Sequence, residues 1–525
     1  MAVALYNQEM KRAVSFSFLA ILLLSLFLQF YHLGERSLWE DEARNAIKSN
    51  WRFERILSYQ KNIVFNLLLF SWSRLGKNEF WLRIPSVLFA LFSLVALFEL
   101  GRRFFSEGIA LSSCLLLSTS PFFLLESRQV KMYSLALLFA LASTYYLMSF
   151  LETGRFGRLL IHLGTSFLAS LTHYMFFSLY LTQLVFLTVT SFKKSGAWAK
   201  RSRTALILLL FLFLPLLPGL LERMGPLRDI FLDSRTAESL LLPFGYFGKI
   251  ALVYYLFTAG PTLFPWNVFW ALPALALPLF LIVLALRKAP RNTSHILVFV
   301  SFFVPTLFLS FLRNAQPRYS FISLPFYALG LGIALFHLRP FWRTFCVSAL
   351  LVIQGYGLMN YYEGRQYLFI AYLEPYREIV QQVRSALKPG DVLLHSQINP
   401  SFDYYLYRVF KEQTPFQRLH WADYDRNIHM EAWGDIQKKF HSGTQRLWFI
   451  ERPPGQSVGL LPISDPGKIH RENILFREWL DHHFRRLDRK TYLKDSSVGQ
   501  KKRFVPKFYS EERIVVSLYD LQSPP

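Results

Sequence analysis

The first apolar run of the chain, Ala13–Tyr31, reads AVSFSFLAILLLSLFLQFY and contains no charged residue. About 20 such residues in a helix cross the roughly 30 Å of hydrocarbon in a bilayer, so this run predicts a membrane-spanning helix. Lys11 and Arg12 precede the run, as basic residues precede the apolar part of a signal peptide. The run is long and no small-residue cleavage site follows it, which favours an uncleaved first helix.

Similar apolar runs recur along most of the chain. Of its 525 residues 53% are hydrophobic and 52 are Phe, which is too apolar for one soluble core. We therefore predict a polytopic α-helical membrane protein with about eleven spans. The expected spans are 13–31, 81–100, 108–125, 133–150, 159–173, 174–191, 203–221, 266–286, 295–313, 319–337 and 344–362. The two cysteines, Cys114 and Cys346, lie inside these spans and are expected to be buried apolar residues.

The net charge of +23 comes largely from short turns between the expected spans. With eleven spans, all the basic turns fall on one side of the membrane, which the positive-inside rule assigns to the cytoplasm. This distribution argues against nucleic-acid binding. It predicts a cytoplasmic N-terminus and an extracytoplasmic tail. The basic turns are Lys11-Arg12, Arg102-Arg103, Arg155 with Arg158, Lys193-Lys194 with Lys200-Arg201-Arg203, Arg287-Lys288 with Arg291, and Arg339 with Arg343.

The composition changes after the last expected span. We expect a membrane domain over 1–362 and a small α/β domain over 363–525, because the tail alternates helical and strand-like patterns. Helices are expected at 374–387 and 472–486, and strands at 391–395, 446–451 and 513–520.

Charged and aromatic residues cluster in the loops expected on the outer side, beginning with Leu38-Trp39-Glu40-Asp41-Glu42-Ala43-Arg44. Charged groups at the edge of a membrane are functional candidates. A carboxylate can take a proton from a hydroxyl, and Arg or Lys can hold a phosphate. Such a set fits the transfer of a sugar from a polyprenyl phosphate. The candidates are Asp41, Glu42, Arg44, Lys61, Arg128, Lys131, Tyr133, His173, Arg318 and Tyr319.

Each candidate also has a simpler interpretation. Asp41 and Glu42 could stabilise the first turn of an interfacial helix. The cations could meet lipid headgroups, and Tyr133 and Tyr319 could be interfacial aromatics. His173 could be a hydrogen-bonded turn residue.

Several ordered motifs resemble the GT-C membrane glycosyltransferases, in the branch of the protein O-mannosyltransferases and bacterial aminoarabinose transferases. Leu38–Arg44 is similar to the Asp-Glu-x-Arg element that follows the first span of that family. The other similar elements are Glu79–Ser86, Gly101–Phe104, Ser120–Phe122, Ser127–Tyr133 and Pro317–Tyr319 with Pro325. The chain departs from the family at Gln129, where many relatives have an acid, and at Lys61-Asn62-Ile63, where His-Pro-Pro is common.

The resemblance implies a GT-C fold with an outward cavity, and roles for particular residues. Asp41 would be the catalytic carboxylate and Glu42 its support. Arg44 and Lys61 would bind the lipid phosphate, and Arg318 would contact the phosphate or the sugar. The partners implied are a polyprenyl-phosphate sugar donor, a glycan, lipid or protein acceptor, and membrane lipid.

A transporter or lipid flippase is the main alternative, and a structural scaffold is a third. The expected spans are apolar and the candidate charged residues lie at one face of the membrane, whereas transporters place polar groups near the bilayer midplane. No cofactor is predicted. Glu40-Asp41-Glu42 could contribute to a metal site, but no second cluster of ligands is evident, so no metal is predicted. The modest tail favours a bacterial inner-membrane protein.

Overall fold

The computed structural model divides into two compact units, which are described separately. It describes residues 2–59, 62–173, 176–193, 195–214, 245–265, 267–311, 316–395, 399–411, 417–420, 444–451, 466–493 and 513–523. The first unit comprises Met1–Leu33, Lys48–Gly76 and Phe80–Gln366, and the second comprises Gly34–Ile47, Lys77–Glu79 and Tyr367–Pro525. The second unit therefore contains, besides the tail, two segments that the sequence assigns to the membrane domain.

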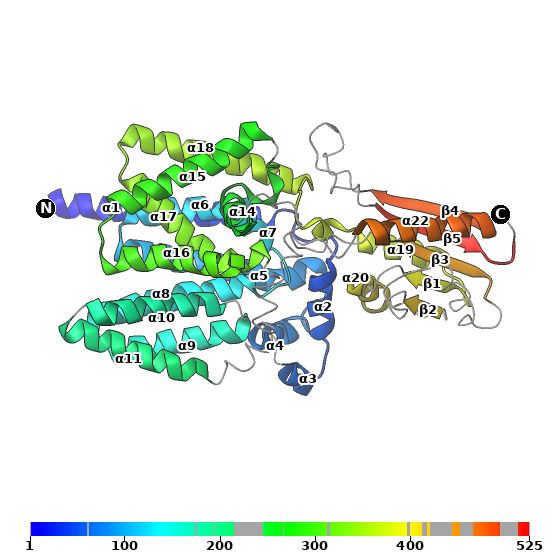
Figure 1. Ribbon diagram of the computed structural model, residues 1–525, viewed down its shortest axis with the longest axis horizontal. Helices are drawn as coiled ribbons and strands as arrows, with labels where there is room; N and C mark the ends of the chain where they lie inside the picture. The colour runs from blue at the N-terminus through cyan, green and yellow to red at the C-terminus, as the bar shows by residue number, and fades with distance from the viewer. Residues whose placement is uncertain are drawn as a thin grey trace. The chain divides into compact units, whose positions relative to one another are not determined.

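The described part of the first unit is helical (Figure 1). Its elements are α1 (Ala2–Phe30), α3 (Phe53–Ser58), α4 (Ile63–Trp72), α5 (Glu79–Phe104), α6 (Glu107–Ser118), α7 (Pro121–Ser127), α8 (Tyr133–Thr153), α9 (Phe156–Thr172), α10 (Phe176–Lys193), α11 (Gly196–Phe213), α14 (Gly245–Ala259), η3 (Gly260–Thr262), α15 (Val268–Lys288), α16 (Thr293–Phe311), η4 (Pro317–Ser323), α17 (Leu324–Phe336) and α18 (Pro340–Tyr362).

Seven helices in the described ranges are long and apolar enough to cross a membrane. They begin in α1, α5, α8, α10, α15, η4 and α18, and each coincides with an expected span. Large apolar side chains such as Phe16, Phe192 and Phe269 are exposed on them, a surface suited to lipid rather than water. The prediction of a polytopic helical membrane protein is confirmed. The count of eleven stays a prediction, because the expected spans 159–173, 203–221 and 295–313 contain helices outside this group and 215–221 lie outside the described residues.

The expected span 108–125 is broken into two helices, α6 and α7, which are bent by 65°. The break follows from local sequence. The Ser120 hydroxyl accepts a hydrogen bond from the Phe123 amide at 3.4 Å, and Pro121 occupies the first helical position, where its missing N–H costs nothing. All of α7 is buried, and it ends at Ser127. The break thus fixes where the following 128–132 loop begins.

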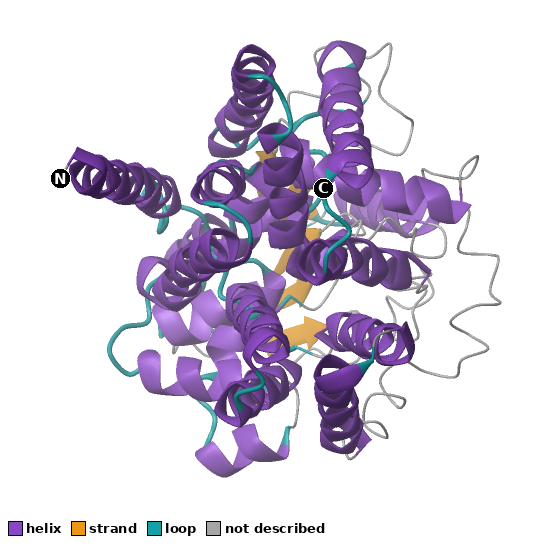
Figure 2. Ribbon diagram, turned by 90° about the vertical axis from the view of Figure 1, so that its left-hand side faces the viewer, coloured by secondary structure: helices purple, strands orange, loops and turns teal. Residues whose placement is uncertain are grey.

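The described part of the second unit combines helices with a five-stranded sheet. Parts of this sheet are seen in orange in Figure 2. The strand order is β2-β1-β3-β5-β4, with β1 parallel to β2 and β3, and β5 antiparallel to β3 and β4. The elements are α2 (Glu40–Lys48), η5 (Ile370–Leu373), α19 (Tyr376–Ala386), β1 (Val392–His395), α20 (Pro400–Asp403), η6 (Tyr404–Val409), β2 (Gln417–His420), β3 (Arg446–Glu451), α22 (Pro466–His483), β4 (Arg485–Leu493) and β5 (Arg513–Asp520).

The core of the sheet forms where its apolar strands meet α22. Phe476 and Leu480 of α22 pack with Leu394, Phe449 and Tyr519 of the strands. The expected strands at 391–395, 446–451 and 513–520 and both expected tail helices are present. The predicted helix 472–486 runs too far, however, because β4 begins at Arg485 and pairs with β5 at the sheet edge. The polar sequence RRLDRKTYL of β4 has no apolar alternation that would predict a strand.

Candidate functional site

Arg128 is held by side chains and backbone at the ends of two helices of the first unit. Its guanidinium donates to the Tyr361 hydroxyl at 3.3 Å and to the Tyr31 carbonyl oxygen. It also lies 5.4 Å from the centres of the Tyr361 and Tyr362 rings. These contacts attach the start of the 128–132 loop to the ends of α1 and α18.

Five of the sequence-predicted residues come together next to this loop. His173 follows α9, and its ring centre lies 5.4 Å from that of Tyr133 and 5.8 Å from that of Tyr319. The Arg318 guanidinium lies 5.9 Å from the Tyr319 ring. Lys131, Tyr133, His173 and Arg318 are all buried. The fold thus gathers two cations, an imidazole and two phenol rings from α8, η4 and two loops.

The surroundings of His173 favour its neutral form. Burial, with the positive charges of Lys131 and Arg318, lowers the pKa of His173 from 6.5 to about 3. The direction has a plain physical cause, since both desolvation and nearby cations disfavour the imidazolium. A neutral imidazole can donate one hydrogen bond and accept another. The cluster can therefore attract an anion through Lys131 and Arg318 while His173 and the tyrosines offer neutral hydrogen-bonding groups.

The acidic residues of the 38–44 motif lie in the second unit, at the start of α2. The Glu42 carboxylate is buried and accepts the backbone N–H of Trp39 at 3.3 Å, an arrangement that caps the helix. Glu40 pairs with Arg44 one turn later, and this Arg44 side chain is exposed. Asp41 is half-buried. The structure therefore gives Glu42 a helix-capping contact, which was the simpler interpretation, and it leaves the role of Asp41 a prediction.

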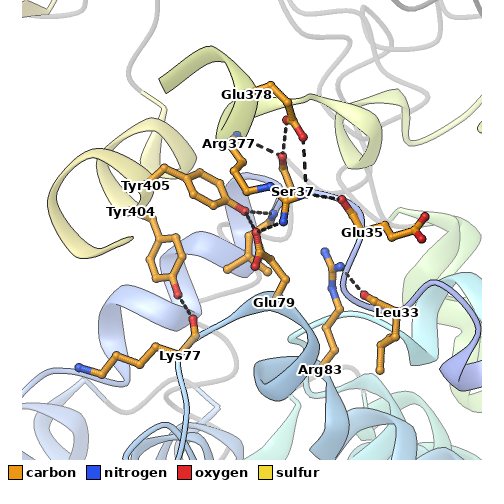
Figure 3. Close-up of polar contacts among 11 residues, drawn as sticks. Leu33, Glu35, Ser37, Lys77, Glu79, Arg83, Arg377, Glu378, Tyr404 and Tyr405 are labelled. Atoms are coloured by element: carbon orange, nitrogen blue, oxygen red, sulfur yellow. Dashed lines mark hydrogen bonds and ion pairs between the residues drawn. The ribbon is translucent and has the colours of Figure 1, made fainter. Parts of the chain in front are cut away.

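No pattern in the sequence indicates the residues that hold the segment before α2 (Figure 3). The Tyr405 hydroxyl accepts the Leu38 backbone N–H at 2.7 Å and donates to the Glu79 carboxylate at 2.9 Å. Arg377 also binds Glu79, at 3.0 Å, and Ser37 contacts the first turn of α19. Glu79 belongs to a motif that resembles the family, but its partners lie about 300 positions away, so no local pattern predicts the pairing.

Two predictions from the sequence are not decided by these contacts. Lys61 lies outside the described residues. In the part of the chain that the structure describes, no three His, Cys, Asp or Glu side chains are grouped as metal ligands would be. The prediction that the protein needs no metal stays a prediction.

Comparison with known proteins agrees with this architecture. The family model of the dolichyl-phosphate-mannose-protein mannosyltransferases matches residues 61–218. The crystal structure of ArnT from Cupriavidus metallidurans bound to undecaprenyl phosphate aligns with 15% identity and a TM-score of 0.52, covering 95% of this chain and 97% of that one. The apo form of ArnT aligns with 14% identity and a TM-score of 0.56, covering 96% and 98%.

A more distant similarity is to the Archaeoglobus fulgidus oligosaccharyltransferase AglB in complex with an inhibitory peptide and a dolichol-phosphate. The identity is 10% and the TM-score 0.53, with 84% of this chain and 69% of that chain covered. Among curated protein sequences no significant match was found. The matched family model and the shared fold confirm the resemblance that the motifs indicated.

Proposed function

We propose that this multi-pass membrane protein, which has the fold of the GT-C glycosyltransferases, transfers a sugar from a polyprenyl-phosphate donor to an acceptor hydroxyl. The observation that carries the proposal is the buried group of Lys131, His173 and Arg318. Buried cations next to hydroxyl-bearing rings suit a phosphate joined to a sugar. The ArnT and AglB structures with bound undecaprenyl phosphate and dolichol-phosphate support this class of donor.

The proposed reaction is one displacement at the anomeric carbon. The acceptor hydroxyl gives its proton to the Asp41 carboxylate, and its oxygen forms the new bond to the sugar. The bond between the anomeric carbon and the phosphate oxygen breaks, and its electron pair leaves with the lipid phosphate. The configuration of the sugar is thereby inverted. Lys131 and Arg318 stabilise the negative charge that develops on the leaving phosphate.

The remaining predicted residues have supporting roles in this scheme. Glu42 supports Asp41 through the start of α2, which its carboxylate caps. Tyr133 and Tyr319 contact His173 and would line the sugar. Arg44, Lys61 and Arg128 stay predicted ligands of the lipid phosphate. The acceptor is a glycan, lipid or protein at the outer face of a bacterial inner membrane, with the N-terminus in the cytoplasm.

The test is transfer from a panel of radiolabelled polyprenyl-phosphate sugars in membranes, comparing wild type with Asp41→Asn. Loss of a general base lowers a rate by about 10²- to 10⁴-fold, while the donor should still bind. Glu54→Gln is the control, because it removes an exposed acid of α3 to which no catalytic or binding role is given, and it should keep transfer. Equal transfer by wild type and Asp41→Asn would remove Asp41 from the mechanism. No transfer by folded wild-type protein would favour transport or a scaffold role instead.

A further inference from the structure

We propose that the first turn of α19, together with Tyr405, positions the segment that leads into α2 and thereby sets the place of Asp41. The inference concerns contacts within the second unit alone. It rests on the proposed function in one respect: Asp41 is the base of the transfer reaction, and the rate of that reaction reports the positioning. Tyr405, Glu79, Arg377 and Ser37 are positioning residues in this view and do not touch the substrate.

Ser37 supplies the cap that α19 lacks in its own sequence. The residue before α19 is Pro375, which makes no side-chain cap. The Ser37 hydroxyl instead accepts the Arg377 backbone N–H at 3.1 Å and donates to the Glu378 carboxylate at 3.2 Å. An uncapped helix start leaves backbone N–H groups unsatisfied, so the helix and the Ser37 segment stabilise each other.

Tyr405 and Glu79 fix the same segment one residue later. The buried Tyr405 hydroxyl joins the backbone N–H of Leu38 to the Glu79 carboxylate. Arg377 closes the arrangement, because one end of its guanidinium binds Glu79 at 3.0 Å and the other donates to the Glu35 carbonyl oxygen at 2.8 Å (Figure 3). Two of these bonds go to backbone atoms of the segment itself. They therefore define where the chain runs and not only what its side chains contact.

The path from these contacts to Asp41 is short and packed. Leu38 and Trp39 are buried, and the Trp39 ring lies 4.3 Å from that of Tyr372. Trp39 is also the residue whose N–H the Glu42 carboxylate caps. The segment is thus held at the backbone of Glu35, Leu38 and Trp39 and at the Ser37 hydroxyl, immediately before Asp41. A displacement of about 1 Å at a reacting group can lower a rate about 100-fold, so loosening these bonds should lower turnover.

The experiment compares Tyr405→Phe with Tyr492→Phe in the full-length protein. Both changes remove one tyrosine hydroxyl near α19, but the Tyr492 hydroxyl donates to Gln382, in the second half of α19, whereas the Tyr405 hydroxyl bonds to the Leu38 backbone. The first readout is hydrogen exchange at the Leu38 amide, which requires no activity. The second is transfer, separated into kcat and donor KM. The matched control accounts for any general effect of losing a hydroxyl in this unit.

The expected result for Tyr405→Phe is faster exchange at Leu38 and a kcat about 10- to 100-fold lower, with donor KM unchanged. Tyr492→Phe should change neither. If Tyr405→Phe folds poorly, Ser37→Ala provides the same comparison, since it deletes one hydroxyl and keeps every ring contact. Its expected effect is faster exchange over the first turn of α19 together with a lower kcat.

Two outcomes overturn the inference. One is unchanged exchange at Leu38 in Tyr405→Phe, and the other is faster exchange with wild-type kcat. Failure of the proposed function gives a different pattern, in which Asp41→Asn keeps the wild-type rate or wild-type protein transfers no sugar. In that case the exchange at Leu38 still decides whether α19 and Tyr405 hold the segment.

Discussion

Replacing Arg318 by glutamine should weaken the binding of undecaprenyl phosphate by about two orders of magnitude. Arg318 is 4% exposed and lies near Lys131 and His173. Truncating one partner of a buried charge pair typically costs 2–5 kcal/mol, so we take a loss of about 3 kcal/mol. Since about 1.4 kcal/mol corresponds to a factor of ten, this loss predicts a Kd about 100-fold higher.

Two comparison variants define how the change acts. Arg318→Lys keeps the charge and loses the planar fork, so binding should fall less than with glutamine. Arg102→Gln removes an exposed cation that pairs with Glu99 at 2.8 Å, and exposed pairs contribute at most about 1 kcal/mol. Its Kd should change less than about five-fold. Because Arg318 is buried, its effect should also depend little on ionic strength.

The assay is equilibrium competition between labelled and unlabelled undecaprenyl phosphate on purified protein in detergent, with melting temperature measured in parallel. The reasoning is refuted if Arg318→Gln binds as tightly as wild type while its melting temperature is unchanged. It is equally refuted if Arg102→Gln weakens binding as much as Arg318→Gln, because burial would then have no influence.

Three further changes probe the same framework. His173 has a pKa lowered to about 3, so below about pH 6.5 it takes up a proton on unfolding, and the stability of the wild type should fall from pH 6.5 towards pH 4. In melting curves measured at several pH values, this fall should be smaller for His173→Gln. Asp391 accepts hydrogen bonds from Arg446 at 2.6 and 2.9 Å, so Asp391→Asn should destabilise the second unit by about 3 kcal/mol in denaturant unfolding. An equal loss from Asp488→Asn, which changes an exposed acid of the same unit, would contradict this reasoning. A side chain at Gly332 would place its Cβ 2.9 Å from the Ile109 carbonyl oxygen. Gly332→Val should therefore lower the free energy of unfolding by about 1–3 kcal/mol, because it separates α6 from α17. A melting temperature equal to that of the wild type would refute this close approach.

Much of the fold was predictable because its determinants are local. An apolar run such as Ala13–Tyr31 predicts a spanning helix by itself, and the strands 446–451 and 513–520 were predicted at their observed bounds. The break in the span 108–125 carried a local signal in Ser120-Pro121 that the hydrophobic pattern concealed. The candidate cations of the 128–132 loop and η4 were identified from their residue types and positions.

The site was less predictable because contacts between distant segments decide it. That Tyr133, His173 and Tyr319 meet is a result of how α8, α9 and η4 pack. The helix-capping contact of Glu42 depends on the backbone at Trp39, which a list of acidic residues does not reveal.

The sequence alone determined that this is a polytopic membrane protein with a small α/β tail, and it named the residue types able to bind a phosphate or take a proton. Only the tertiary structure decided that Ser37 caps α19 and that Tyr405 holds Leu38, across separations of 340 and 367 positions. The physical reason is that a helix forms through interactions of residues close in sequence with one another and with solvent or lipid. A cap or hydrogen bond between remote segments forms only after folding has brought them within about 3 Å.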